Sequence, residues 1–180
     1  MITLRTGICT AAAAVLATGL TIAATQGSSH AATSIPAAPH VIGGATLHTQ
    51  VNLPPSTWVT TPLSVHLPRA GTYEIDANVR GRLAGSSTLN TYITARLWND
   101  ETDAPVIYSE RLVYQVISFV PNSGPVGGNN TAPIDEWVTV QGPTTIRLQA
   151  LDVNAAGMAS IAQIYSASDG YTTLRWTRVS

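Results

Sequence analysis

The feature that most constrains the fold is an almost unbroken alternation of apolar and polar residues in the stretch AGTYEIDANVRGRL, from Ala70 to Leu83. Successive side chains of a β-strand point to opposite faces of a sheet, so alternation with a period of two predicts a strand with one buried face. The apolar face would carry Tyr73, Ile75, Ala77, Val79 and Leu83, and the polar face Glu74, Asp76, Asn78, Arg80 and Arg82.

The same alternation recurs along the rest of the chain. The segments PLSVHLP, TYITARLWN, TTIRLQAL and TTLRWTRV each place apolar residues at every second position, and turn-rich segments connect them. AAGMASIAQIYSAS is ambiguous between a helical turn and an extended segment, and no other part shows a helical period. We therefore predict an all-β fold: a two-sheet antiparallel jelly-roll sandwich that forms one domain over residues 46–180.

The first 31 residues have the composition of an export signal. Arg5 precedes an apolar, alanine-rich run, and the small residues Ser29 and Ala31 predict cleavage before Ala32. A retained membrane anchor is the competing interpretation, but the run is marginal in length and leads directly into the cleavage site. We expect a signal peptide over residues 1–31 and a secreted, extracellular protein that has no membrane attachment after cleavage.

Two segments read as flexible connections. Residues 32–45 mix proline, glycine and small side chains without a period, which predicts a flexible linker or arm. Residues 121–136, PNSGPVGGNNTAPIDE, are polar and rich in glycine, which predicts a long flexible loop.

Composition excludes several kinds of chemistry. All nine basic residues are arginine, a bias typical of a high-GC genome such as that of an actinobacterium, and without lysine there is no Schiff-base chemistry and no phosphate-loop lysine. The only cysteine, Cys9, lies in the expected signal peptide, so no disulfide or thiolate nucleophile is expected in the mature chain. The net charge of −1 is not that of a nucleic-acid-binding protein, and we expect no nucleic-acid partner.

Three stretches resemble, in order, one known superfamily. AGTYEIDANVRG is similar to the glycine-tyrosine strand of the complement globular-head and tumour necrosis factor-like jelly rolls. IRLQALDVNAAGM resembles a later strand and loop of the complement heads, and TTLRWTRVS stands where their closing strand stands. The resemblance implies a bacterial secreted member with a two-sheet jelly roll, which usually forms a homotrimer, binds partners and catalyses nothing.

The candidate catalytic and metal-binding residues favour neither activity. His40, His48 and His66 lie in no nucleophile or zinc motif, and Glu74 and Asp76 project side by side, whereas a glycosidase needs its carboxylates on opposite sides of the sugar. The turn at residues 99–105 and the loop at residues 152–157 carry enough oxygen ligands for a calcium ion, but neither has the spacing of a calcium loop. We expect no enzyme, no metal site and no cofactor, with calcium as a weaker alternative.

Two sets of residues are candidates for binding. Tyr92, Arg96 and Trp98 would face outward together from one strand and Trp137 from another, which suits stacking on sugar rings or packing against a neighbouring chain. By the resemblance, the row Glu74, Asp76, Arg80 and Arg82 would lie with Arg175 in the sheet that faces the threefold axis, as a polar seam between subunits. We therefore predict a self-associating interaction or structural module, with a carbohydrate-binding module for cell-wall or environmental polysaccharide as the alternative.

Overall fold

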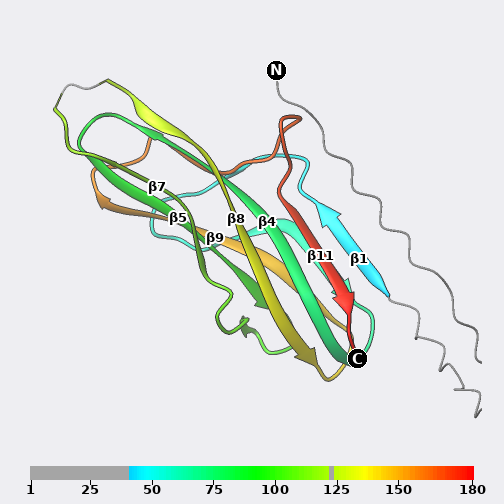
Figure 1. Ribbon diagram of the computed structural model, residues 1–180. Helices are drawn as coiled ribbons and strands as arrows, with labels where there is room; N and C mark the ends of the chain where they lie inside the picture. The colour runs from blue at the N-terminus through cyan, green and yellow to red at the C-terminus, as the bar shows by residue number, and fades with distance from the viewer. Residues whose placement is uncertain (1–40, 122–123) are drawn as a thin grey trace, which may run out of the picture. The chain divides into compact units, whose positions relative to one another are not determined.

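The structure is a computed structural model that describes residues 41–121 and 124–180 (Figure 1). The chain divides into compact units over residues 1–37 and 38–180, and all described residues belong to the second. The described residues form strands and no helix, with the bounds β1 Ile42–Thr46, β2 Val51–Asn52, β3 Val59–Leu67, β4 Gly71–Gly85, β5 Leu89–Asn99, β6 Ala104–Pro105, β7 Arg111–Ser118, β8 Val126–Val140, β9 Thr144–Ala156, β10 Ile161–Ile164 and β11 Thr173–Arg178. The predicted signal peptide lies outside the described residues.

The strands form two antiparallel sheets, here called sheet A and sheet B. Sheet A has the order β1-β11-β4-β8, and β10 and β2 continue it beside the second half of β4. Sheet B has the order β3-β9-β5-β7, and β6 pairs with the far end of β5. The chain crosses repeatedly from one sheet to the other, so most neighbouring strands are distant in sequence, and only β5, β6 and β7 pair with strands close to them in the chain. This arrangement is a jelly roll, and the predicted fold class is confirmed.

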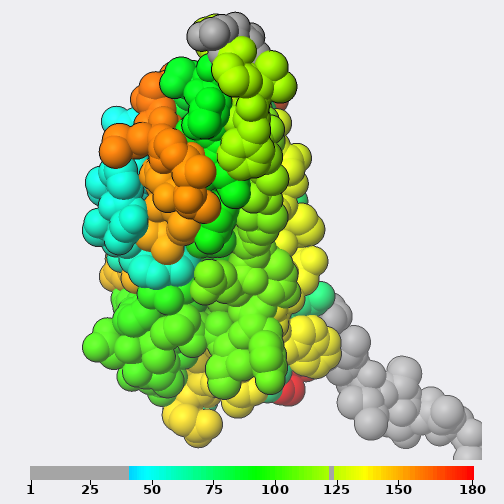
Figure 2. All heavy atoms as spheres, turned by 90° about the vertical axis from the view of Figure 1, so that its left-hand side faces the viewer, coloured from blue at the N-terminus to red at the C-terminus, as the bar shows by residue number. Residues whose placement is uncertain are grey.

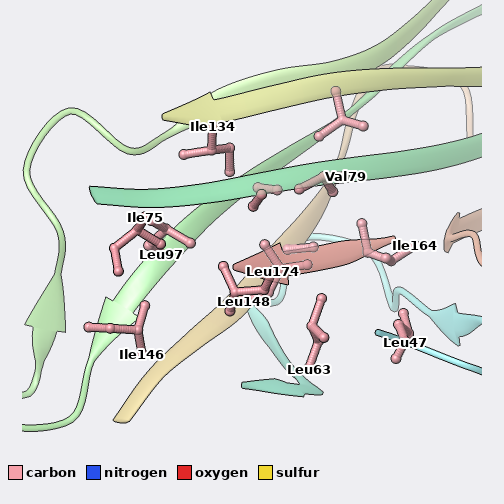
Figure 3. Packing of buried hydrophobic residues seen from close by; sticks show 14 of the residues in the cluster. Leu47, Leu63, Ile75, Val79, Leu97, Ile134, Ile146, Leu148, Ile164 and Leu174 are labelled. Atoms are coloured by element: carbon pink, nitrogen blue, oxygen red, sulfur yellow. The ribbon is translucent and has the colours of Figure 1, made fainter. Parts of the chain in front are cut away.

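The core lies between the two sheets and is built from the alternate residues that the sequence pattern marks. The apolar face of β4 is fully buried, from Tyr73 to Leu83. Side chains of sheet A, such as Ile75 and Leu174, meet Leu97 and Leu148 of sheet B (Figure 3). Because every long strand contributes to this single layer, the other face of each sheet remains at the surface.

The domain begins earlier than predicted. β1 pairs with β11 from Ile42 to Thr46, so the end of the segment predicted as a flexible arm is a strand of sheet A. Gly43 lies against the indole of Trp176, where an added Cβ would come within 2.6 Å of the ring. The glycine that suggested a linker is therefore required by close packing of β1 on β11. The part of the predicted arm before residue 41 lies outside the described residues.

The prediction of a flexible loop at residues 121–136 is wrong for most of this segment. β8 pairs with β4 in an unbroken register from Val126 opposite Gly85 to Val140 opposite Gly71. β8 lies at the edge of sheet A, where proline and glycine are tolerated because one side of the strand needs no hydrogen-bond partner. Gly127 has a φ of 155° and lies so close to Leu83 that an added Cβ would be 2.3 Å from its carbonyl oxygen.

The segment AAGMASIAQIYSAS, which is ambiguous in the sequence, contains β10 and is extended.

β7 of sheet B and β8 of sheet A lie side by side along one edge of the sandwich (Figure 2). In the part of the chain that the structure describes, no helix is long and apolar enough to cross a membrane.

Candidate functional site

The outer face of sheet A is the most distinctive surface of the molecule, and its residues lie in rows across the sheet. Paired residues of antiparallel strands point to the same face, so β1, β11, β4 and β8 each contribute one outward side chain to a row. Figure 1 shows these four strands side by side, with β8 and β1 at opposite edges.

One row, here called the tryptophan row, crosses the sheet from Ile42 through Thr177 and Glu74 to Trp137. Trp137 is 69% exposed and Ile42 is 70% exposed. Each end of the row is thus a large apolar side chain in contact with water, and the polar residues lie between them.

The neighbouring row, here called the aspartate row, crosses from Gly44 through Arg175 and Asp76 to Asp135. Asp76 and Asp135 are directly opposite each other, an arrangement of like charges that destabilises a sheet. Within residues 41–121 and 124–180, no hydrogen bond or ion pair engages the side chains of Asp135 and Arg175, and Asp76 accepts only a long contact of 3.5 Å from Asn78. The row therefore presents a positive charge near one edge and two negative charges near the other.

A depression of about 640 Å³ lies on this face beside β1. On this face Gly44, opposite Arg175, has no side chain to fill the space, whereas Gly43 is turned toward the buried indole of Trp176. Its lining consists of Ile42, Gly43, Gly44, Glu74, Asp76, Arg175, Trp176 and Thr177.

Arg80 and Arg82 share this face but are engaged within the chain. Arg80 pairs with Asp169 at 3.4 Å and also donates to the carbonyl of Gly170, and its hydrogen bond holds the pKa of the Asp169 carboxyl below its usual value. Arg82 donates to Asn129 at 2.8 Å, and its guanidinium lies 3.6 Å from the ring centroid of Tyr165. The predicted charged row is thus divided: its acids are at the surface without strong partners, whereas its arginines hold the loop that follows β10.

The predicted aromatic set is not brought together. Tyr92, Arg96 and Trp98 lie on the outer face of sheet B, whereas Trp137 lies on the outer face of sheet A. The two groups face away from each other across the core, so they cannot form a single binding surface.

On sheet B, the guanidinium of Arg96 lies close to two indole rings. It is 3.8 Å from the ring centroid of Trp58 and 5.2 Å from that of Trp98, and its Nε donates to Oε1 of Gln149 at 2.9 Å. Desolvation lowers the pKa of Arg96, and the nearby charge of Glu110 acts in the opposite direction. Trp58 was not among the predicted site residues, because it lies in the irregular segment before β3, where alternation gives no orientation.

Asp100 and Asp152, one from each candidate calcium loop, accept hydrogen bonds from protein groups. Asp100 accepts from Nε of Arg147 at 2.8 Å, and the buried Asp152 accepts from Thr91 and Asn154 at 3.0 and 2.7 Å. Among the residues whose placement is described, no group of three or more histidine, cysteine, aspartate or glutamate side chains gathers around a point.

Two members of the outer face of sheet A were not predicted. Asp135 would have followed from extending the alternation of β8 back to the buried Ile134, which places Asp135 outward beside Trp137. Ile42 had no usable signal, since it lies in a segment whose glycines and prolines resemble those of a linker.

The strand order and the two packed sheets define the class of protein: a jelly-roll β-sandwich module. No family model matches the chain, and the search of curated proteins also finds no match. Among solved structures, the chain is similar to that of the infectious bursal disease virus Gx strain, with 14% identity, a TM-score of 0.49 and coverage of 78% of this chain and 32% of that chain. The VP2 subviral particle of the same virus gives 15% identity, a TM-score of 0.46 and coverage of 78% and 32%.

The chain spans about a third of the length of these viral chains. At these TM-scores the likeness carries no argument about function, and the fold class rests on the strand order alone.

Proposed function

We propose that this protein is a secreted, non-enzymatic structural or interaction module that self-associates through the outer face of sheet A. The observation that carries the proposal is Trp137, a tryptophan that is 69% exposed on a regular sheet face, next to acids without strong partners. Tryptophan is enriched where proteins bind other proteins.

The resemblance to the complement and tumour necrosis factor-like jelly rolls supports a homotrimer with sheet A toward the threefold axis. The order of strands in sheet A, β1-β11-β4-β8, brings the opening strand, the closing strand and the alternating strand Gly71–Gly85 into one surface. Arg175 lies beside Asp76 on this surface, as the proposed polar seam requires.

The arrangement of the acids supports a role without catalysis. Glu74 and Asp76 project in the same direction from neighbouring positions of an open sheet face, so they cannot enclose a substrate between them. A charged row of this kind contributes more to the specificity of a contact than to its affinity.

Reversal of the acidic charges tests the proposal. We expect the double variant Glu74→Arg, Asp76→Arg to lose the oligomeric mass of the wild type in light scattering while its thermal unfolding stays within a few degrees, because both side chains are exposed. Glu110→Arg, a reversal at an exposed position before β7, is the control and should keep the oligomer. If the double variant keeps the oligomeric mass, Glu74 and Asp76 do not take part in self-association and the row is an ordinary solvent-exposed face.

Polysaccharide binding is the second candidate, and the stack of Trp58, Arg96 and Trp98 on sheet B favours it. Two indoles held by a guanidinium offer a rigid aromatic surface for a sugar ring. If the protein binds glycan, Trp98→Ala should abolish its retention on insoluble cell-wall polysaccharide and Trp137→Ala should not. Equal retention of the wild type and Trp98→Ala would exclude this surface.

A further inference from the structure

We propose that copies of this chain associate head to tail: Trp137 of one copy packs into the depression beside β1 of the next, and Asp135 faces Arg175. The inference rests on the proposed self-association and names the two surfaces that meet. The occupant of the depression is thus a second copy of this chain.

The two surfaces lie at opposite edges of sheet A. β8 carries Trp137 and Asp135 at one edge, and β1 with β11 forms the depression toward the other. The four strands of the sheet lie about 4.8 Å apart, so the edges are separated by about 14 Å. One copy can therefore present its β8 edge to a neighbour while its own depression receives the β8 edge of a third copy.

The chemistry of the two edges matches row by row. In the tryptophan row, Trp137 at one edge corresponds to Ile42 at the other, and both are about 70% exposed. In the aspartate row, the negative Asp135 at one edge corresponds to the positive Arg175 near the other.

In a closed ring whose axis is parallel to the strands, equivalent residues of all copies lie at the same height along the axis. Contacts between neighbouring copies therefore form between residues of the same row. Such a ring joins apolar to apolar in the tryptophan row and opposite charges in the aspartate row. It also relieves the repulsion between Asp76 and Asp135, because Arg175 of the neighbour approaches them.

The depression has a suitable form for an indole. Its volume of about 640 Å³ lies within the range of about 300–1,000 Å³ that holds small organic groups. Its lining includes the glycine backbone of β1 at Gly43 and Gly44 and the exposed side chain of Ile42, against which a ring can pack, and Glu74 and Asp76 also line it.

The same geometry excludes Arg80 and Arg82 from the contact. Arg80 lies four residues beyond Asp76 on β4, which is about 13 Å along the strand. In a ring of this kind the acids of one chain cannot reach these arginines of the next, and both arginines already have partners within their own chain. Arg175 is the cation of the seam.

A disulfide between the two edges tests the contact. In a Cys9→Ser background, the double variant Asp135→Cys, Arg175→Cys replaces both charges together and keeps Trp137. Under oxidation we expect covalent species larger than a dimer on a non-reducing gel, ending at the size of the ring, and no product from either single-cysteine variant. A product that stops at the dimer would show a twofold contact and overturn the head-to-tail arrangement.

A mass measurement on the same samples separates the two proposals. If the wild type is oligomeric but the double-cysteine variant does not cross-link, the head-to-tail contact is wrong and self-association stands. If the wild type is a monomer, the proposed function itself is wrong.

Filling the depression is an independent test. Thr177→Trp places a large side chain in the depression at a partly exposed position, and we expect it to lower the oligomeric mass as Trp137→Ala does. Gln115→Trp, at an exposed position on sheet B, is the control and should leave the mass unchanged. If Thr177→Trp and Trp137→Ala both keep the oligomer, the depression has another occupant, such as residues 32–40 of the same chain, and the inference is overturned.

Discussion

Single residues decide how closely the strands of sheet A approach each other. The indole of Trp176 is buried beneath β1 and meets the ring of Tyr73 edge to face, with centroids 5.4 Å apart. Gly43 leaves the space that this packing needs. A glycine that the sequence places in the predicted linker is therefore a packing residue in the fold.

Gly43→Ala should destabilise the protein. The added Cβ would lie 2.6 Å from the Trp176 ring, so β1 or the indole must move, and overpacking of this kind costs about 1–3 kcal/mol. Urea unfolding would measure the loss. Gly142→Ala is the matched control, because no atom lies within 4 Å of its added Cβ. Equal stability of the two variants would mean that the contact of Gly43 with Trp176 is not tight.

The sequence predicts at the residue scale which way a side chain faces, but not what it contacts. Alternation places Arg80 and Arg82 correctly on the outer face of β4. Their partners Tyr165 and Asp169 come from a loop that is more than 80 residues away, and no local pattern reports such a contact.

Whole strands can be predicted from the sequence where one face is buried and the other is exposed to solvent. β4 follows directly from its alternation, and β3, β5, β9 and β11 follow in the same way. β8 was missed because its first half is an edge strand rich in glycine and asparagine, whose pairing comes from the long partner β4 rather than from its own apolar residues.

The edges of the two sheets are joined by an ion pair between β7 and β8. Nη2 of Arg111 lies 2.7 Å from Oε1 of Glu136, whose side chain is only 16% exposed. Arg111→Met should lower the free energy of unfolding by about 1–3 kcal/mol, because it leaves a poorly hydrated carboxylate without its partner. The double variant Arg111→Met, Glu136→Met should recover most of the loss in chemical denaturation. A double variant less stable than the single variant would show that the ion pair stabilises the fold by more than the desolvation of its charges costs.

At the scale of the molecule, the candidate site is a property of the register between strands. Trp137, Arg175 and Asp76 could each be selected from the sequence as outward-facing residues. That Asp76 lies between Asp135 and Arg175, and that Trp137 and Ile42 end the same row, depends on pairings between segments far apart in the chain. Sequence alternation therefore predicts the members of the surface but not their arrangement.

The central claim is that the outer face of sheet A joins copies of this chain. Light scattering of the purified protein over a range of concentrations, with Trp137→Ala measured beside it, tests this claim most directly. The account predicts an oligomer of about three times the monomer mass for the wild type, by resemblance to the jelly-roll homotrimers, and a shift toward the monomer for Trp137→Ala, because truncation of a buried interface tryptophan removes a large share of the contact energy. A wild type that remains monomeric at the highest concentration would contradict it.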